Sequence, residues 1–178
     1  MSMEFFTVLP MWNYSSKQIT ITDSKNVQVG YIQRKYKSLR ENLIHYSPLS
    51  LSFLETIHID GEDKDNRLEI REQSFKSNLK KLKWDIFLND PAKENKFLLE
   101  DKTKISTNPR MAYHKNKQKY VFKKDPFNRT CEVTLNDHSC VTIRIDKKIP
   151  PSLRTVMDTG DLTIIELLGI YYVINLTY

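Results

Sequence analysis

Short stretches in which apolar and polar residues alternate follow one another along most of the chain. Alternation with a period of two residues is typical of a strand that buries one face. The stretches with this pattern are residues 17–22, 27–31, 51–60, 67–71, 82–88, 111–113, 120–122, 131–135 and 141–145. Clusters of turn-forming residues separate them, for example at 23–26, 61–66 and 136–139. Strands at intervals of about 8–12 residues predict an antiparallel sandwich or barrel.

The segment 162–176 has a different pattern, because nearly every position is apolar and the main interruptions are Glu166 and Gly169. It is preceded by residue types that begin helices, namely Asp158, Thr159 and Asp161. A helix that is apolar on all sides must be buried, so we expect a core helix enclosed by the sheet. The many β-branched residues leave two buried strands joined at Gly169 as an alternative.

Length and composition favour one folded domain over residues 1–178. Hydrophobic residues make up 39% of the chain, which is enough for a core, and no linker or repeat divides it. The chain has four glycines, whose positions are Gly30, Gly61, Gly160 and Gly169. Their spacing excludes the phosphate-binding P-loop, the dinucleotide fingerprint and the nucleophile elbow.

Nothing in the sequence directs the chain to a membrane or an oxidising compartment. Two cysteines do not make a disulfide framework. The first twelve residues lack the basic and apolar regions of a signal peptide. No apolar stretch reaches the roughly 18 residues that a spanning helix needs. We therefore expect a cytoplasmic protein that is not transmembrane.

The positive charge is concentrated in one part of the chain. The net charge is +6 overall, but residues 76–124 hold 14 basic and 5 acidic residues, a net charge of +9. Residues 1–75 have a net charge of −1 and residues 125–178 a net charge of −2. A concentrated basic excess indicates an anionic partner more strongly than the same excess spread evenly.

Three stretches carry a resemblance to a known family. Residues 21–30 (ITDSKNVQVG) have the pattern strand, Asp, turn, strand; residues 83–90 (KWDIFLND) form a strand with Trp84; and residues 161–176 form the apolar helix. Together they resemble the tubby C-terminal-like superfamily, which includes tubby proteins, phospholipid scramblases and LURP-one-related proteins. The resemblance implies a closed antiparallel β-barrel of about twelve strands around a hydrophobic C-terminal helix.

The resemblance also implies a binding or scaffold role without catalysis. Eukaryotic tubby domains bind phosphoinositides through basic residues, but no motif of this sequence is close enough to carry those residues over one by one. The chain also lacks the membrane tail and the cysteine-rich segment that scramblases carry. It is more similar to the small cytoplasmic members of the superfamily.

Candidate anion-binding residues lie in the basic segment. Lys117, Lys119 and Lys123 share the outward face of one predicted strand. Lys81 and Lys83 share the outward face of another. If these strands are neighbours, the basic residues form one surface for a partner protein or an anionic lipid surface. The alternative is a solvated face whose lysines prevent edge pairing. The complete candidate set is Lys81, Lys83, Lys102, Lys104, Arg110, Lys115, Lys117, Lys119 and Lys123.

Nucleic acid is a less favoured partner for this surface. A stacking platform needs aromatic and basic residues on the same face. The aromatic residues of the basic segment alternate in phase with the core instead; they are Trp84, Tyr113, Tyr120 and Phe122.

The sequence predicts no metal site and no cofactor. The four histidines have no metal-ligand spacing; they are His45, His58, His114 and His138. Cys131 is in phase with its strand's apolar residues and Cys140 is out of phase, so we expect the two thiols on opposite sides of the sheet. A disulfide between them is then not expected.

Carboxylates are the other side chains that could act as catalytic groups. Glu62, Asp63 and Asp65 lie in one predicted polar turn, where carboxylates are normally solvated. Glu166 is different, because a charge in an apolar helix is costly unless it is paired. We expect Glu166 to meet a lysine or arginine at the barrel rim; a functional acid in a cavity is the alternative.

The sequence thus predicts a non-enzymatic cytoplasmic binding or scaffold protein, with a peripheral place at the membrane as an option. Its basic face (residues 76–124) would bind an anionic partner. The alternative function is an immunity or inhibitor protein that binds and neutralises a toxin or other effector, for which the net charge of +9 would fit an acidic target. An enzyme whose site is assembled from unlinked positions is the third hypothesis.

Overall fold

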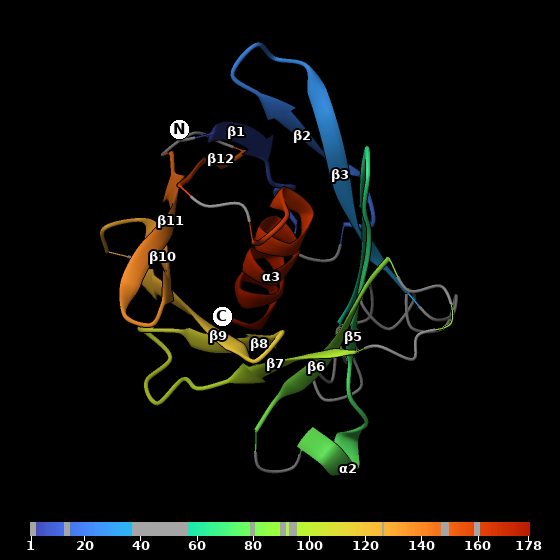
Figure 1. The fold of residues 1–178 in the computed structure, drawn as a ribbon, viewed down its shortest axis with the longest axis vertical. Helices are drawn as coiled ribbons and strands as arrows, with labels where there is room; N and C mark the ends of the chain where they lie inside the picture. The colour runs from blue at the N-terminus through green and yellow to red at the C-terminus, as the bar shows by residue number, and fades with distance from the viewer. Residues whose placement is uncertain are drawn as a thin grey trace.

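An antiparallel barrel encloses the C-terminal helix (Figure 1). The computed structural model describes residues 3–12, 15–36, 57–78, 81–89, 92, 96–125, 127–146, 150–158 and 161–178. In these residues twelve strands close into one barrel, in which each strand pairs with its neighbours in the chain and β1 pairs with β12. The predictions of a β-barrel and of a buried C-terminal helix are both confirmed.

The bounds of the elements are as follows. The first six strands are β1 (Met3–Val8), β2 (Ile19–Asp23), β3 (Gln28–Lys35), β4 (His58–Asp63), β5 (Arg67–Glu72) and β6 (Lys83–Leu88). The other six are β7 (Phe97–Asp101), β8 (Arg110–Lys115), β9 (Gln118–Asp125), β10 (Thr130–Leu135), β11 (His138–Ile145) and β12 (Ser152–Met157). The helices among the described residues are α2 (Phe75–Asn78) and α3 (Ile164–Thr177).

Three strands have no counterpart among the alternating stretches, namely β1, β7 and β12, and the pairing of β1 with β12 closes the barrel. β1 carries apolar side chains on its outer face as well, because Phe6 and Val8 are exposed. β12 places a polar residue, Thr155, on its buried face between Leu153 and Met157. The sequence of neither β1 nor β12 therefore alternates between apolar inward and polar outward residues.

Gly61 lies inside a strand and not in the predicted turn. A Cβ at this position would lie 3.1 Å from both Ile32 Cγ2 and the Tyr31 carbonyl oxygen, so a side chain here would have to push β3 and β4 slightly apart. The turn begins after Asp63, whose Oδ1 accepts hydrogen bonds from the backbone N–H groups of Asp65 and Asn66. Residues 51–56 of the predicted strand 51–60 lie outside the described residues.

α3 begins at a different residue from the one predicted. Its N-cap is Thr163, whose side chain accepts from the backbone N–H of Glu166 at 3.2 Å. The carboxylate of Glu166 accepts in return from the Thr163 backbone N–H at 2.8 Å. This capping box fixes the start of the helix. Of the predicted cap residues, Asp158 and Asp161 lie ahead of it and Thr159 lies outside the described residues.

α3 is buried along residues 164–174, so the alternative of two strands joined at Gly169 is excluded. A Cβ on Gly169 would lie 2.7 Å from Leu68 Cδ2 and 3.1 Å from Ile70 Cδ1. The glycine therefore lets the helix lie directly against β5. Within the described residues, no helix is both long enough and apolar enough to cross a bilayer.

The helix defines two ends of the barrel, because every strand is antiparallel to its neighbours. Even-numbered strands end where α3 begins: Lys115, the last residue of β8, contacts Glu166. Odd-numbered strands end where α3 ends: Asp101, the last residue of β7, accepts from the Tyr178 hydroxyl at 2.7 Å. These ends are called the amino end and the carboxyl end of the barrel below.

Candidate functional site

A basic groove lies beside the loop between β7 and β8 and over the outer face of β8 and β9. Its cavity volume is about 370 Å³. Four basic side chains and an apolar floor line it; the lining residues are Lys102, Lys104, Ile105, Asn108, Arg110, Ala112, Lys119 and Val121.

Hydrogen bonds at the base of the loop hold the basic residues together. Thr103 Oγ1 accepts from the Arg110 backbone N–H at 2.9 Å. The Lys102 backbone N–H donates to the Arg110 carbonyl at 2.8 Å. Asp101 Oδ1 accepts from the Thr103 backbone N–H at 2.8 Å. The loop therefore leaves and re-enters the barrel at one fixed point, which places Lys102 beside Arg110.

The floor of the groove follows from the pairing of β8 with β9. Ala112 lies directly opposite Val121, and both side chains occupy outward positions of their strands. Lys119 lies on the same face of β9 as Val121, two residues away, and faces His114 across the pair. Apolar side chains on the outer face thus separate the cations at the two sides of the groove.

The groove carries positive charge that the barrel does not neutralise. Among the described residues, no carboxylate lies within 4.0 Å of the charged groups of Lys104, Arg110 or Lys119. Lys102 has a partner, because its Nζ lies 2.6 Å from Glu100 Oε2. The hydrogen bond from Lys102 is the main cause that lowers the pKa of Glu100, and Lys83 acts in the same direction.

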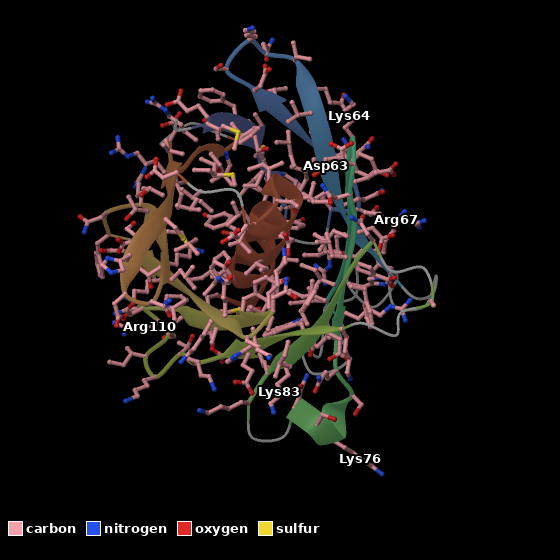
Figure 2. All side chains as sticks on the ribbon, viewed as in Figure 1. Asp63, Lys64, Arg67, Lys76, Lys83 and Arg110 are labelled. Carbon is pink, nitrogen blue, oxygen red and sulfur yellow. The ribbon has the colours of Figure 1, made fainter. Side chains whose placement is uncertain are left out.

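The nine candidate residues separate into several places. The groove unites Lys102, Lys104, Arg110 and Lys119, and Lys123 faces Arg110 across β8 and β9. The strands of Lys83 and Lys119 are not neighbours, because β7 and β8 lie between them, a separation of about 14 Å. Figure 2 shows Lys83 and Arg110 pointing away from the barrel. Lys81 precedes β6 and Lys117 lies in the β8–β9 turn, both outside the groove.

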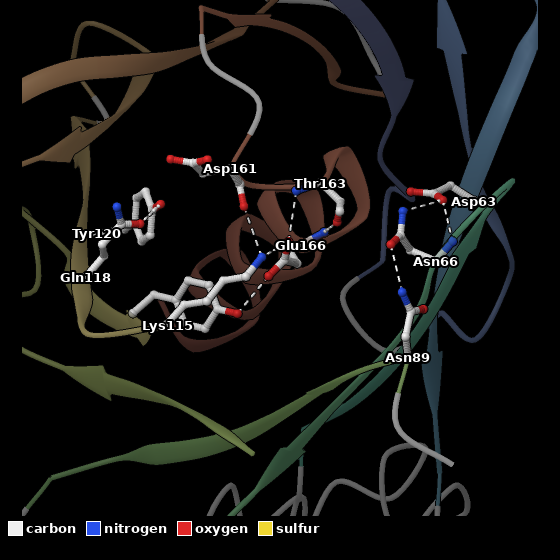
Figure 3. A network of polar contacts seen from close by, with 10 residues as sticks. Asp63, Asn66, Asn89, Lys115, Gln118, Tyr120, Asp161, Thr163 and Glu166 are labelled. Atoms are coloured by element: carbon white, nitrogen blue, oxygen red, sulfur yellow. Dashed lines mark hydrogen bonds and ion pairs between the residues drawn. The ribbon is translucent and has the colours of Figure 1, made fainter. Parts of the chain in front are cut away.

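Lys115 does not belong to the basic surface, and its expected place there was wrong. The residue is 9% exposed. Its Nζ lies 2.9 Å from Glu166 Oε2 and donates to the Asp161 carbonyl at 3.0 Å (Figure 3). Lys115 continues the inward face of Met111 and Tyr113, so the alternation itself places it inside. The expectation that Glu166 pairs with a lysine or arginine is confirmed.

A second polar cluster lies on the outer face of β4 and β5. His58 Nε2 lies 3.2 Å from Asp60 Oδ1 and 3.0 Å from Glu69 Oε1. The hydrogen bond from His58 is the main cause that lowers the pKa of Asp60. The donor set resembles a metal site, but Arg71 Nε donates to the same Glu69 oxygen. Because that cation already neutralises Glu69, we interpret the cluster as an ion-pair network.

The two thiols are not on opposite sides as expected. A bulge leaves Cys140 as an extra residue, because Val133 pairs with Val141 and Thr134 pairs with Ser139. Cys140 therefore joins Cys131 in the core, and both are free. Burial raises the pKa of Cys131 to about 12 and also raises the pKa of Cys140. Neither thiol is an activated nucleophile.

The apolar lining of the groove was missed by reasoning from charge. Ala112 and Val121 are apolar residues at outward strand positions, and Ile105 lies in a polar loop. The sequence did contain a signal for this floor, because apolar residues occupy outward strand positions between lysines. Glu100 was also missed as the counter-charge of Lys102, although the two residues are only two positions apart; its second lysine partner, Lys83, comes from β6, which only the strand pairing brings beside β7.

Comparison with known proteins agrees with this architecture. The family model described as Tubby C-terminal like domain matches residues 5–178. This range contains the two described helices and all twelve described strands except the first two residues of β1. Comparisons with curated proteins and with solved structures gave no match. The chain belongs to the Tubby C-terminal like domain family.

Proposed function

We propose that this protein is a non-catalytic binding protein whose basic groove holds the phosphate groups of an anionic lipid surface. The observation that carries the proposal is a set of three cations around one cavity that have no carboxylate partner among the described residues: Lys104, Arg110 and Lys119. Membership of a family with a general binding role supports it. We propose that the protein is cytoplasmic and peripheral at the membrane.

The chemistry of the groove suits phosphate. The planar guanidinium of Arg110 can donate two parallel hydrogen bonds to phosphate oxygens, and the lysines supply point charges around it. Like charges around one cavity repel one another, and a bound anion relieves that repulsion. The apolar floor of Ala112 and Val121 offers no hydrogen-bond partner that would compete with the lysines.

The test is binding to phosphatidylcholine vesicles with and without phosphatidylserine, at low and at high salt. Lys104→Gln/Lys119→Gln removes two groove charges from exposed side chains. Each charge contributes about 1 kcal/mol near an anionic surface, so we expect binding to weaken about 30-fold. The control Lys25→Gln/Lys64→Gln removes the same charge from exposed lysines in turns at the amino end.

The proposal is supported if the groove variant alone loses binding and if the wild-type protein loses it in high salt. It fails if phosphatidylserine makes no difference or if both variants weaken binding equally. A single-stranded oligonucleotide that binds where vesicles do not would favour nucleic acid. A protein complex that moderate salt does not weaken would favour the immunity or inhibitor function.

A further inference from the structure

Large apolar side chains are exposed at the carboxyl end of the barrel. Ile105, in the loop between β7 and β8, is 65% exposed, and Phe127, in the turn between β9 and β10, is 85% exposed. At the same end, the segment that follows β1 exposes Met11 and Trp12, by 59% and 60%. Single exposed apolar side chains are normal on a protein surface, so the meaning of these residues depends on what surrounds them.

The two loops that carry Ile105 and Phe127 are neighbours. The Lys124 backbone N–H donates to the Pro109 carbonyl at 3.0 Å, which joins the end of β9 to the start of β8. Asp125 Oδ1 accepts from the backbone N–H of Phe127 at 2.9 Å, so this turn holds its aromatic residue outward. Ile105 also lines the groove. Ile105 therefore lies among the groove cations, and Phe127 lies in the turn that follows β9, whose Lys123 faces Arg110.

The charge around these loops is positive. Residues 101–110 and 123–130 hold six basic and two acidic residues. Both carboxylates already have internal partners: Asp101 accepts from Tyr178, and Asp125 accepts from the backbone of its own turn. The exposed apolar side chains are separated by basic residues, so they do not form the flat, continuous apolar patch of a protein interface. They suit a bilayer, whose interface accepts isolated side chains and whose headgroups supply negative charge.

We propose that the carboxyl end of the barrel docks on an anionic bilayer, where Ile105, Phe127 and Trp12 enter the interfacial region. This inference rests on the proposed function, because the groove cations then contact headgroups of the same bilayer. Trp12 and Phe127 are residue types that favour the membrane interface. The axis of α3 then points with its C-terminus toward the membrane.

The first test compares two double variants that remove exposed apolar residues. Ile105→Ser/Phe127→Ser alters the carboxyl end, whereas Met3→Ser/Val27→Ser alters residues that are 47% and 57% exposed at the amino end. We expect the first variant to bind phosphatidylserine-containing vesicles at least tenfold more weakly than the wild type, because two apolar side chains no longer leave water. The second variant should bind like the wild type. Circular dichroism confirms that both variants fold.

The second test uses the tryptophans as reporters. Trp12 is 60% exposed and Trp84 is 0% exposed, so a change in emission on vesicle binding reports Trp12. We expect a blue shift with phosphatidylserine vesicles and quenching by lipids brominated on their acyl chains. A Trp12→Phe variant should lose both signals, which assigns them to this residue.

The inference and the proposed function can fail separately. If the Ile105/Phe127 variant binds as tightly as the wild type, or if the Met3/Val27 variant weakens equally, the docking orientation is wrong. An unshifted Trp12 emission on bound vesicles would also overturn it. In each case the groove proposal survives if Lys104→Gln/Lys119→Gln still weakens vesicle binding, and it fails if that variant binds normally.

Discussion

Lys115 and Glu166 form an ion pair inside the barrel, with Nζ 2.9 Å from Oε2, although 51 residues separate them in the chain. The same Oε2 accepts from the Thr163 backbone N–H, and Oε1 accepts from the Tyr113 hydroxyl at 2.7 Å. One carboxylate thus caps α3 and joins the helix to β8. A buried charge is tolerated when its oxygens are satisfied in this way.

The first prediction concerns the loss of this pair. Lys115→Met should lower the free energy of unfolding by about 3–5 kcal/mol, because Glu166 stays buried without its cation. Urea denaturation followed by circular dichroism measures the change. The control is Lys96→Met, which removes a 58% exposed partner of Asp85 at 3.5 Å. That variant should lose at most about 1 kcal/mol.

A double variant isolates the interaction between the two charges. Adding Glu166→Gln to Lys115→Met removes the uncompensated charge and should restore part of the lost stability. Equal losses in Lys115→Met and Lys96→Met would show that the buried pair contributes no more than a surface pair. A strictly additive double variant would show that the two groups are not coupled.

The inward face of most strands could be predicted from the sequence, because side-chain alternation is a local property. Trp84 and Ile86 on β6 and Tyr120 and Phe122 on β9 are all buried as the pattern predicts. The buried helix was predictable for a similar reason, since an apolar segment has no solvent-facing side. These inferences need no knowledge of which strands are neighbours.

The groove could not be predicted in the same way, because it depends on which strands are neighbours. Lys119 and Lys102 come together through the pairing of β7, β8 and β9, whereas Lys83, on β6, contacts Glu100 but does not line the groove. Lys115 was expected on the surface as one of the residues of the basic segment, although it is in phase with Met111 and Tyr113 and so lies on the inward face of β8. The bulge at Cys140 likewise breaks the alternation at one residue that the sequence does not mark.

The second prediction concerns the contact between α3 and β5. Gly169→Val should lower the free energy of unfolding by about 3 kcal/mol, because its Cβ would lie 2.7 Å from Leu68 Cδ2 in a closed core. Shortening the neighbour should relieve this clash, so Leu68→Ala should cost less in the Gly169→Val background than alone. Thermal and urea denaturation of the wild type, the two single variants and the double variant give the coupling between residues 68 and 169. Equal costs of Leu68→Ala in the two backgrounds would contradict the close approach.

The third prediction concerns Glu100, the counter-charge beside the groove. The hydrogen bond from Lys102 lowers the pKa of Glu100 below its ordinary value of 4.5. A carboxylate with a lowered folded-state pKa stabilises the protein above the unfolded-state pKa, and this stabilisation is lost as the pH falls through the folded-state pKa. Glu100→Gln should therefore cost up to about 1 kcal/mol at neutral pH. The difference from the wild type should shrink below pH 4.5 and then vanish.

The same substitution should have the opposite effect on binding, because it frees Lys102 from its carboxylate. One added charge near an anionic surface contributes about 1 kcal/mol, so Glu100→Gln should bind phosphatidylserine vesicles about fivefold more tightly at neutral pH. Stability and affinity then change in opposite directions, as expected if Glu100 limits the positive charge of the groove. If stability and vesicle affinity both decrease in Glu100→Gln, Glu100 instead maintains the shape of the loop that carries Lys102 and Lys104.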